Sequence, residues 1–306
     1  MASIETPKRL VGCELINFAA QEPSAFANLC EQSYQIRVET AAKQIIESGR
    51  PIVMLTGPSA TGKTTSAHRL CEAITALGHR SVVLSLDDFF VGEGRYPKRP
   101  DGKDDYERVE ALDLPILHHC LRELAQTGCC QAPEFDFITQ RPKAATRFVD
   151  CRGGVAIVEG LHAFNPLLIE TLPADVVLNL YASLREEYVG ADGRRIIATR
   201  DIRLARRIIR DALFRGHDAD FTLELWPHVC HAEQGCIRAF KNRADLVLDT
   251  SFSYELGLWE PLLSAATAPR HAAKLAQLRA RFAALTPIPL QVVPQGSMLR
   301  EFTGDK

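Results

Sequence analysis

The chain has 306 residues, of which 46% are hydrophobic, enough apolar material for a core in one large domain or two smaller ones. Its 36 Lys and Arg side chains nearly balance 38 Asp and Glu side chains, so the net charge is only −2 at pH 7. This balance provides no overall positive field that would attract nucleic acid or an anionic membrane, and any cationic site must be local.

The nine cysteines are scattered along the chain without C-x-x-C spacing, which favours reduced thiols over a zinc site or a disulfide framework. No stretch reaches the length of a membrane-spanning helix, and the N-terminus lacks the continuous apolar run of a secretory signal. These features predict a cytoplasmic protein. They leave open whether it forms a homo-oligomer.

Residues 1–32 show no clear periodicity and are treated as an N-terminal extension. An apolar stripe then predicts a helix over residues 33–48, which leads into a buried strand at residues 52–56. The next eight residues match the phosphate-binding pattern G-x-x-x-x-G-K-[ST], and an amphipathic helix is expected at residues 64–77. A strand before the motif and a helix after it are the context that a P-loop requires.

The residue types of this loop suit phosphate binding. The two glycines let backbone N–H groups approach phosphate oxygens closely, and the helix N-terminus adds positive potential. Lys63 is expected to reach the β- and γ-phosphates, and the Thr64 hydroxyl is expected to ligate Mg²⁺. The predicted nucleotide-binding residues of the loop are Gly57, Ser59, Ala60, Thr61, Gly62, Lys63, Thr64 and Thr65.

Acidic residues end two further predicted strands. Asp87 and Asp88 follow residues 81–86, and Glu159 closes the apolar run that begins at residue 155. Open α/β sheets bind ligands outside the carboxyl ends of their strands, so these acids are expected near the P-loop, with Glu159 in the Walker-B position for Mg²⁺. Asp at such a position can also serve as a cap or turn residue.

The segments around these strands are more ambiguous. Residues 91–110 form a long loop rich in Gly, Pro and charge, which favours substrate handling, and a helix is expected at residues 110–125. Residues 133–142 alternate between two prolines and predict an edge strand, whose aromatic side chains suit a planar ligand or an ordinary packed edge equally well. Further strands are expected at residues 176–181 and 245–249.

A helix predicted at residues 199–214 carries the richest basic cluster of the chain. Arg203, Arg207 and Arg210 share one side with Arg200, while apolar residues line much of the other side. A solvated basic face is the ordinary meaning of this pattern. A lid over residues 194–217 is the favoured hypothesis, because phosphoryl transfer requires mobile cations. Residues 261–306 are expected to form a C-terminal helix near residues 269–285 and a tail, outside a single domain at residues 33–260.

Taken together, these motifs resemble the uridine kinase and phosphoribulokinase family of P-loop kinases, and most closely the uridine kinase-like proteins. The resemblance covers about residues 45–260, and the tail at residues 297–302 resembles one uridine kinase-like branch. It rests on Gly57 to Thr65, Leu84 to Phe90, Pro133 to Phe137, Val158 to Pro166, Arg206 to Asp211 and Arg215 to His217.

The resemblance implies an α/β fold, a three-layer sandwich with a parallel five-stranded sheet in the order 2-3-1-4-5. It implies ATP and Mg²⁺ and transfer of the γ-phosphoryl group to the 5′-hydroxyl of a small-molecule nucleoside, with no nucleic acid or membrane partner. Asp87 matches the catalytic acid that accepts the hydroxyl proton and lies near the metal, and Glu159 matches the second acid beside the metal. The matching basic positions, which contact triphosphate and substrate, are Arg207, Arg210 and Arg215.

The substrate side departs from the family pattern. Glu107 stands where uridine-cytidine kinases carry an Asp against the ribose, and Phe135 and Gln140 replace the Tyr and His that contact the pyrimidine. Gln140 is therefore expected to read the base with relaxed choice. The full predicted substrate-binding set is Asp87, Tyr106, Glu107, Phe135, Asp136, Gln140, His162 and Arg207.

Other classes stay open. Residues 150–153 resemble the D-x-x-G and residues 242–245 the N-K-x-D of a GTPase, but both segments precede strands and are expected at the wrong edge of the sheet. A nucleotide-binding protein without catalysis is a second alternative, although Lys63, Thr64 and Asp87 are all present. Among kinases, phosphoribulokinase-like and pantothenate kinase-like activities remain alternatives.

Overall fold

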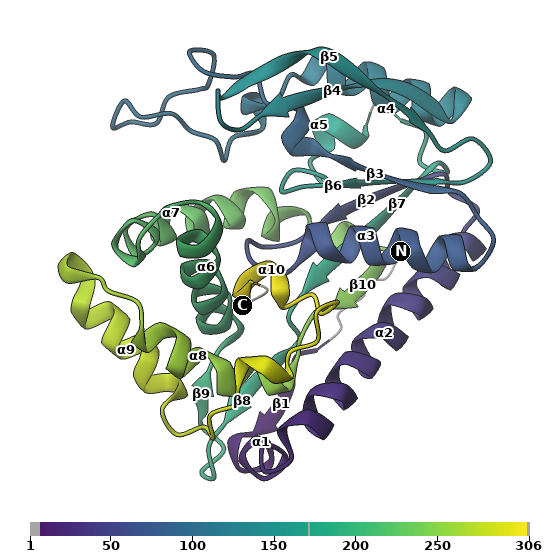
Figure 1. The fold of residues 1–306 in the computed structure, drawn as a ribbon. Helices are drawn as coiled ribbons and strands as arrows, with labels where there is room; N and C mark the ends of the chain where they lie inside the picture. Colours follow the sequence, from purple (N-terminus) through teal and green to yellow (C-terminus); the bar gives the residue numbers. More distant parts are fainter. Residues whose placement is uncertain (1–6, 171, 305–306) are drawn as a thin grey trace.

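The computed structural model describes residues 7–170 and 172–304, and a five-stranded parallel sheet forms its centre (Figure 1). All four neighbouring strand pairs are parallel. Numbered along the chain, the strands follow the order 2-3-1-4-5, and the predicted P-loop kinase fold is confirmed. Across the sheet the strands are β3 (Ser81–Ser85), β6 (Val155–Glu159), β2 (Ile52–Thr56), β7 (Val177–Ser183) and β10 (Leu246–Asp249).

The two central strands are buried along their whole length because helices cover both faces of the sheet. Val53 and Leu55 belong to the hydrophobic cluster that contains α2 (Pro23–Glu47) and α3 (Lys63–Ala76). Ile52 and Met54 point to the opposite face, into the cluster of α4 (Leu114–Thr127) and α5 (Pro166–Ile169). The three-layer arrangement therefore follows from continuous apolar runs in β2 and β6.

The first face also holds the C-terminal half of the chain. Buried side chains of helices α6 to α10 join the same cluster as α2 and α3, and Figure 1 shows them as a helical layer beside the sheet. Helix α6 has the predicted bounds. These helices are α6 (Thr199–Phe214), α7 (Ala219–Cys236), α8 (Leu256–Ser264), α9 (Ala272–Phe282) and α10 (Arg300–Thr303).

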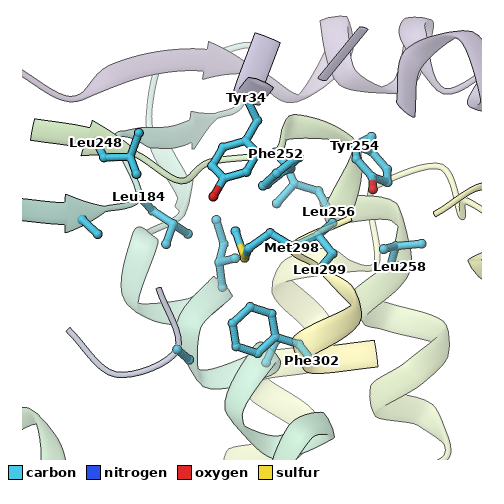
Figure 2. Packing of buried hydrophobic residues seen from close by; sticks show 14 of the residues in the cluster. Tyr34, Leu184, Leu248, Phe252, Tyr254, Leu256, Leu258, Met298, Leu299 and Phe302 are labelled. Carbon is cyan, nitrogen blue, oxygen red and sulfur yellow. The ribbon is translucent and has the colours of Figure 1, made fainter. Parts of the chain in front are cut away.

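The two ends of the chain are integrated into this body. Strand β1 (Arg9–Gly12) pairs in parallel with β8 (Glu186–Val189), which pairs with β9 (Arg195–Ile197), and α1 (Cys13–Ala19) follows β1. Helix α2 begins ten residues before the predicted helix, because its buried face continues through Ala27, a small residue that adds little to a hydrophobic pattern. At the other end, Met298, Leu299 and Phe302 are fully buried against Leu184, Phe252 and neighbouring residues (Figure 2).

A two-stranded antiparallel sheet covers the top of the molecule in Figure 1. The predicted edge strand lies within it, as parts of β4 (Cys129–Asp136) and β5 (Arg141–Asp150) and the turn between them. The preceding loop at residues 91–108 contains mostly turns and short bridges. Within the described residues, every helix is too short or too polar to cross a bilayer.

Candidate active site

The P-loop lies between β2 and α3, and two of its glycines are sterically required. A Cβ atom on Gly57 would lie 2.1 Å from the carbonyl oxygen of Ala182, the residue beside it on β7. Gly62 has a φ of 77°, and a Cβ atom there would lie 2.3 Å from the Sδ atom of Met298. Ala60 is also left-handed, with a φ of 60°. The loop therefore has the tight backbone that presents N–H groups to an anion.

The polar side chains of the loop bond within it. Thr61 Oγ1 donates to the carbonyl oxygen of Pro58 at 2.8 Å, and Lys63 Nζ donates to the same oxygen at 3.2 Å. Burial lowers the pKa of Lys63, whereas the charge of Glu159 raises it. The ammonium group thus lies over the loop.

Two acids stand beside the start of α3. Glu159 Oε1 at the end of β6 accepts hydrogen bonds from Thr64 Oγ1 at 3.2 Å and from Ser85 Oγ at 2.9 Å. Burial, followed by the negative charge of Asp87, raises the pKa of Glu159 to about 7. Water reaches Asp87, yet surrounding protein atoms raise the pKa of its carboxyl group, while Lys63 lowers it.

These oxygens form the set that could hold a metal. No cluster of three or more His, Cys, Asp or Glu suited to an ion occurs in the described parts of the chain. Mg²⁺ needs no such cluster, because it takes one or two carboxylates together with phosphate oxygens and waters. Thr64, Glu159 and Asp87 fit that requirement.

Helix α6 turns its arginines toward the P-loop. Arg207 Nη1 donates to Ser59 Oγ at 2.8 Å, and Arg203 Nε donates to the Ser59 carbonyl oxygen at 2.8 Å. The side chain of Arg210 is nearly buried and donates to Asp211 at 2.7 Å. The basic face of α6 is therefore buried against the loop, whereas Leu213, expected on the opposite side, is exposed.

Two other arginines of this region have different surroundings. Arg206 forms a buried salt bridge with Glu255, with both hydrogen bonds at 2.7 Å, and so contributes to the core. Arg215 is half-exposed just past the end of α6, and its charge lowers the pKa of Asp87. Arg215 thus lies on the side of the site where Asp87 stands.

Two acidic residues at the loop gave no recognisable sequence signal. Glu233 of α7 accepts the Ser59 N–H at 2.8 Å and binds Arg203 through both carboxylate oxygens. Glu301 of the tail accepts a hydrogen bond from Thr65 Oγ1 at 2.6 Å. Both contacts join segments more than 170 positions apart, and no short motif encodes such a pairing.

Several predicted substrate residues lie near these groups. Glu107 is half-buried, and burial raises its pKa. The charges of Arg207 and Lys63 lower this pKa, whereas the charge of Glu233 raises it. His162 is buried, neither ring nitrogen has a hydrogen-bond partner of ordinary geometry among the described residues, and burial lowers its pKa to about 4.

The aromatic candidates form a separate layer. Phe135 packs edge-on against Phe90 with ring centroids 5.7 Å apart, and Tyr106 packs against Tyr96 at 4.7 Å. The backbone N–H of Phe135 donates to Asp88 at 3.4 Å, which links β4 to the segment after β3. Phe135 is therefore held beside Asp88, the residue that follows Asp87 in the sequence.

Asp136 and Gln140 lie elsewhere, in the turn between β4 and β5. Asp136 Oδ1 accepts the N–H of Ile138 at 2.9 Å, and Gln140 Nε2 donates to the Phe137 carbonyl oxygen at 2.8 Å. Gln140 is exposed and has a φ of 54°. Both polar groups stabilise the turn, and no hydrogen bond or salt bridge within residues 7–170 and 172–304 joins their side chains to the P-loop.

The segments that resemble GTPase motifs lie at the opposite edge of the sheet. Asp150 precedes β6 and binds Arg152, while Asp245 precedes β10 and binds Arg50, the residue that leads into β2. This edge carries the amino ends of the strands, away from the P-loop. These residues therefore cannot contact a nucleotide bound there.

Comparison with known proteins agrees with these features. Residues 52–253 match the Phosphoribulokinase / Uridine kinase family. The Uridine/cytidine kinase UKL1, chloroplastic, of Arabidopsis thaliana is 30% identical over 174 residues, which are 56% of this chain and 32% of that protein. A uridine kinase of Deinococcus deserti is 27% identical over 201 residues, which are 65% of this chain and 87% of that protein.

The matched region spans about a third of the length of the plant relative. Among solved structures, phosphoribulokinase from Rhodobacter spheroides has a TM-score of 0.45 and 18% identity, over 68% of this chain and 74% of that one. The family match runs from the first strand of the central sheet past the last one. The chain belongs to the phosphoribulokinase and uridine kinase family.

Proposed function

We propose that the chain is an ATP-dependent kinase that transfers the γ-phosphoryl group of ATP to the 5′-hydroxyl of a uridine- or cytidine-like nucleoside. One observation supports the proposal: a lysine, a carboxylate and an arginine from three different segments of the chain lie at one P-loop. Lys63 begins α3, Asp87 follows β3, and Arg207 lies on α6. Phosphoryl transfer is catalysed mainly by such positioning and charge stabilisation.

The chain's own groups would bind the triphosphate. The backbone N–H groups of residues 60–65 and the ammonium group of Lys63 would hold phosphate oxygens, and Arg207, Arg210 and Arg215 would compensate charge on the transferring group. Lys63 and Arg207 already donate to loop oxygens of Pro58 and Ser59. An anion in the loop would replace these weaker acceptors.

The metal side follows from the same residues. Thr64, Asp87 and Glu159 would hold Mg²⁺, which when bound would neutralise charge on the β- and γ-phosphates. Glu159 must lose its proton before it can serve there, and its pKa of about 7 makes that step depend on pH near neutrality.

Asp87 is the candidate base for the acceptor hydroxyl. Burial raises its pKa, against the opposing charges of Lys63 and Arg215, and so brings it closer to the range in which a carboxylate accepts a proton effectively. Asp88 instead accepts the backbone N–H of Phe135 and lies 4.0 Å from Arg147. The division of roles between the two adjacent acids supports Asp87 as the base.

The acceptor would bind on the Asp87 side of the loop, near Glu107, Tyr106, Phe135 and His162. The relatives with uridine kinase names support a nucleoside there. One observation favours a second acceptor class, such as ribulose 5-phosphate or pantothenate: Gln140, the predicted base reader, is bonded within its own turn. In the nucleoside proposal, Gln140 and Asp136 must leave that turn to contact the base.

Turnover on a panel of acceptors tests the proposal. The purified chain with ATP and Mg²⁺ should release ADP with uridine or cytidine faster than with ribulose 5-phosphate, pantothenate or no acceptor. Lys63→Ala should lower kcat by about 10²-fold or more, the scale for losing one electrostatic stabiliser. Arg194→Ala, an exposed position in the β8–β9 turn, is the matched control for surface charge. Turnover without dependence on Lys63 would refute the P-loop chemistry, and a preference for another acceptor would refute the nucleoside assignment alone.

A further inference from the structure

A second cationic site adjoins the P-loop on the side away from Asp87. A cavity of about 470 Å³ lies between the end of β7, the β8–β9 pair, the start of α6 and the C-terminal part of α7. Pro58 and Thr61 form one wall, but Lys63, Thr64, Asp87 and Glu159 do not line it. We call it the β7 cavity, and it is separate from the group of residues assigned above to phosphoryl transfer.

The β7 cavity is strongly positive in a chain that is slightly negative overall. Eight Lys or Arg side chains line it against three Asp or Glu side chains. The three acids are already paired: Glu187 binds Lys8 and Arg195, Glu233 binds Arg203, and Asp201 lies 3.4 Å from Arg281. Positive charge therefore remains for an anionic ligand.

Arg185 is the residue that most clearly indicates an anionic ligand in this cavity. It is only 4% exposed, its Nε atom has no hydrogen-bond partner, and its guanidinium group forms no salt bridge within the described residues. Asp249 accepts the backbone N–H of Arg185, but the side chain of Asp249 pairs with Arg9. A buried guanidinium without a counter-charge is costly unless a ligand supplies one.

Other groups complete the site. Ser183, two residues earlier at the end of β7, has a buried Oγ atom for which the described part of the chain provides no hydrogen-bond partner. At the rim, Arg200 and Arg238 are exposed and form no salt bridge with any residue of the described chain. Leu184 and Ile237 add apolar wall. The volume falls in the range of small-molecule sites and exceeds the need of a single inorganic ion.

We propose that the β7 cavity binds a phosphorylated small metabolite, with the phosphoryl group against Arg185 and Ser183 and the organic part against the apolar wall. Arg203 couples this site to the P-loop, because its guanidinium group lines the cavity and also holds the Ser59 carbonyl oxygen and Glu233. An anion that draws Arg203 toward the cavity loosens Glu233, which holds the Ser59 N–H. Occupancy of the cavity therefore changes nucleotide affinity.

Pyrophosphate is the probe, and the P-loop is filled first so that the two sites are distinguished. The full chain is saturated with AMP-PNP in excess Mg²⁺ and titrated with pyrophosphate by calorimetry. We expect one further anion to bind. Arg185→Met should weaken its binding by about tenfold or more, the scale for a hydrogen bond to a charged group. Arg194 is an exposed arginine in the β8–β9 turn that does not line the cavity. Arg194→Met should therefore leave the affinity for pyrophosphate unchanged.

Coupling is tested by reciprocity. The factor by which pyrophosphate changes AMP-PNP affinity must equal the factor by which AMP-PNP changes pyrophosphate affinity, and we expect about fivefold or more. In Arg185→Met this factor should approach one. If Arg185→Met does not fold, the double variant Arg200→Ala with Arg238→Ala takes its place. This double variant should weaken the binding of pyrophosphate.

Three results would overturn the proposal. The first is no binding of millimolar pyrophosphate to the chain filled with AMP-PNP. The second is strict competition between the two ligands, which would make the cavity part of the nucleotide site. The third is binding that neither Arg185→Met nor the rim variants change. None of these outcomes depends on the identity of the phosphoryl acceptor, so they are distinguishable from failure of the proposed kinase activity.

Discussion

Adjacent residues with different surroundings have different expected roles, and Asp87 and Asp88 illustrate this. The charges of Lys63 and Arg215 lower the pKa of Asp87, which burial raises, whereas Asp88 accepts the backbone N–H of Phe135. Asp87→Asn keeps the size of the side chain but removes a proton acceptor, so we expect transfer to fall by about 10²-fold or more while AMP-PNP still binds. Asp88→Asn should reduce transfer much less. Single-turnover assays measure both, and a larger loss in Asp88→Asn would show that Asp88 is the base.

The pKa of Glu159 predicts a pH dependence of stability. Its folded pKa of about 7 lies above the ordinary value of 4.5, so the folded chain holds this proton more tightly than the unfolded chain. The stabilising contribution of the protonated form is complete below the ordinary pKa and is lost as the pH rises toward about 7. Without nucleotide or Mg²⁺, the free energy of unfolding should therefore decline through this range.

Glu159→Gln removes this titration and provides the comparison. Urea denaturation at several pH values should give a shallower decline for Glu159→Gln than for the unsubstituted chain. At pH 8 the variant should be the more stable of the two, because it keeps no buried charge. Parallel pH profiles would contradict the burial effect, and Glu93→Gln, at an exposed acid, is the matched control.

At the scale of elements, α6 is the main candidate for movement. Its residues 199–208 are anchored by buried Ile202, Ala205 and Ile208, while Arg210 and Arg215 lie near its C-terminal end. The lid predicted at residues 194–217 should therefore order only in part. We expect AMP-PNP and Mg²⁺ to increase hydrogen-exchange protection at residues 210–217 and to change residues 199–208 little. Equal protection of residues 210–217 with and without AMP-PNP would mean that α6 is a fixed wall.

The two-stranded sheet contributes differently from the central one. Its strands β4 and β5 hold Phe135 beside the Asp87 segment, and its turn holds Gln140 in a left-handed conformation. A turn residue can leave its local hydrogen bond at the cost of about 0.5–1.5 kcal/mol. The hydrogen bond that holds Gln140 in the turn is thus weak enough for a bound acceptor to displace.

At the scale of the whole molecule, the tail and the P-loop form one structure. Met298 packs against Gly62, and Glu301 binds Thr65. The Cζ atom of Arg206 lies over the ring of Phe302, 5.0 Å from the ring centroid. Met298 is fully buried with the aromatic cluster of Figure 2. The C-terminal segment therefore supports the nucleotide loop from behind.

Two tail variants separate packing from hydrogen bonding. Met298→Ala should lower the free energy of unfolding by about 2–5 kcal/mol, the cost of a large-to-small change in a core. Glu301→Gln should cost only about 0.5–1.5 kcal/mol, because it weakens one hydrogen bond. Urea denaturation measures both. If Met298→Ala costs no more than Glu301→Gln, the tail is not part of the core.

The local signals of the sequence were sufficient for the P-loop, the strands of the central sheet and the bounds of α6, whereas the order of those strands followed from the family resemblance. A buried parallel strand is a short apolar run, and Gly57 and Gly62 stand where a Cβ atom would clash, so each feature is encoded within a few residues. Asp87 and Glu159 followed because parallel strands bring their carboxyl ends to one edge. The family followed from the order of these motifs.

Tertiary structure alone decided which distant residues complete the site. Glu233 contacts Ser59 across 174 positions and Glu301 contacts Thr65 across 236. Arg185 has no salt-bridge partner among the described residues because the nearby acids pair with other cations. Gln140 matched a base-reading position in the sequence, but its backbone conformation and its hydrogen bond to Phe137 hold it in a turn. Sequence patterns report what a residue and its near neighbours prefer. Contacts between distant residues depend on how whole helices and strands pack, and no single residue or short motif determines that packing.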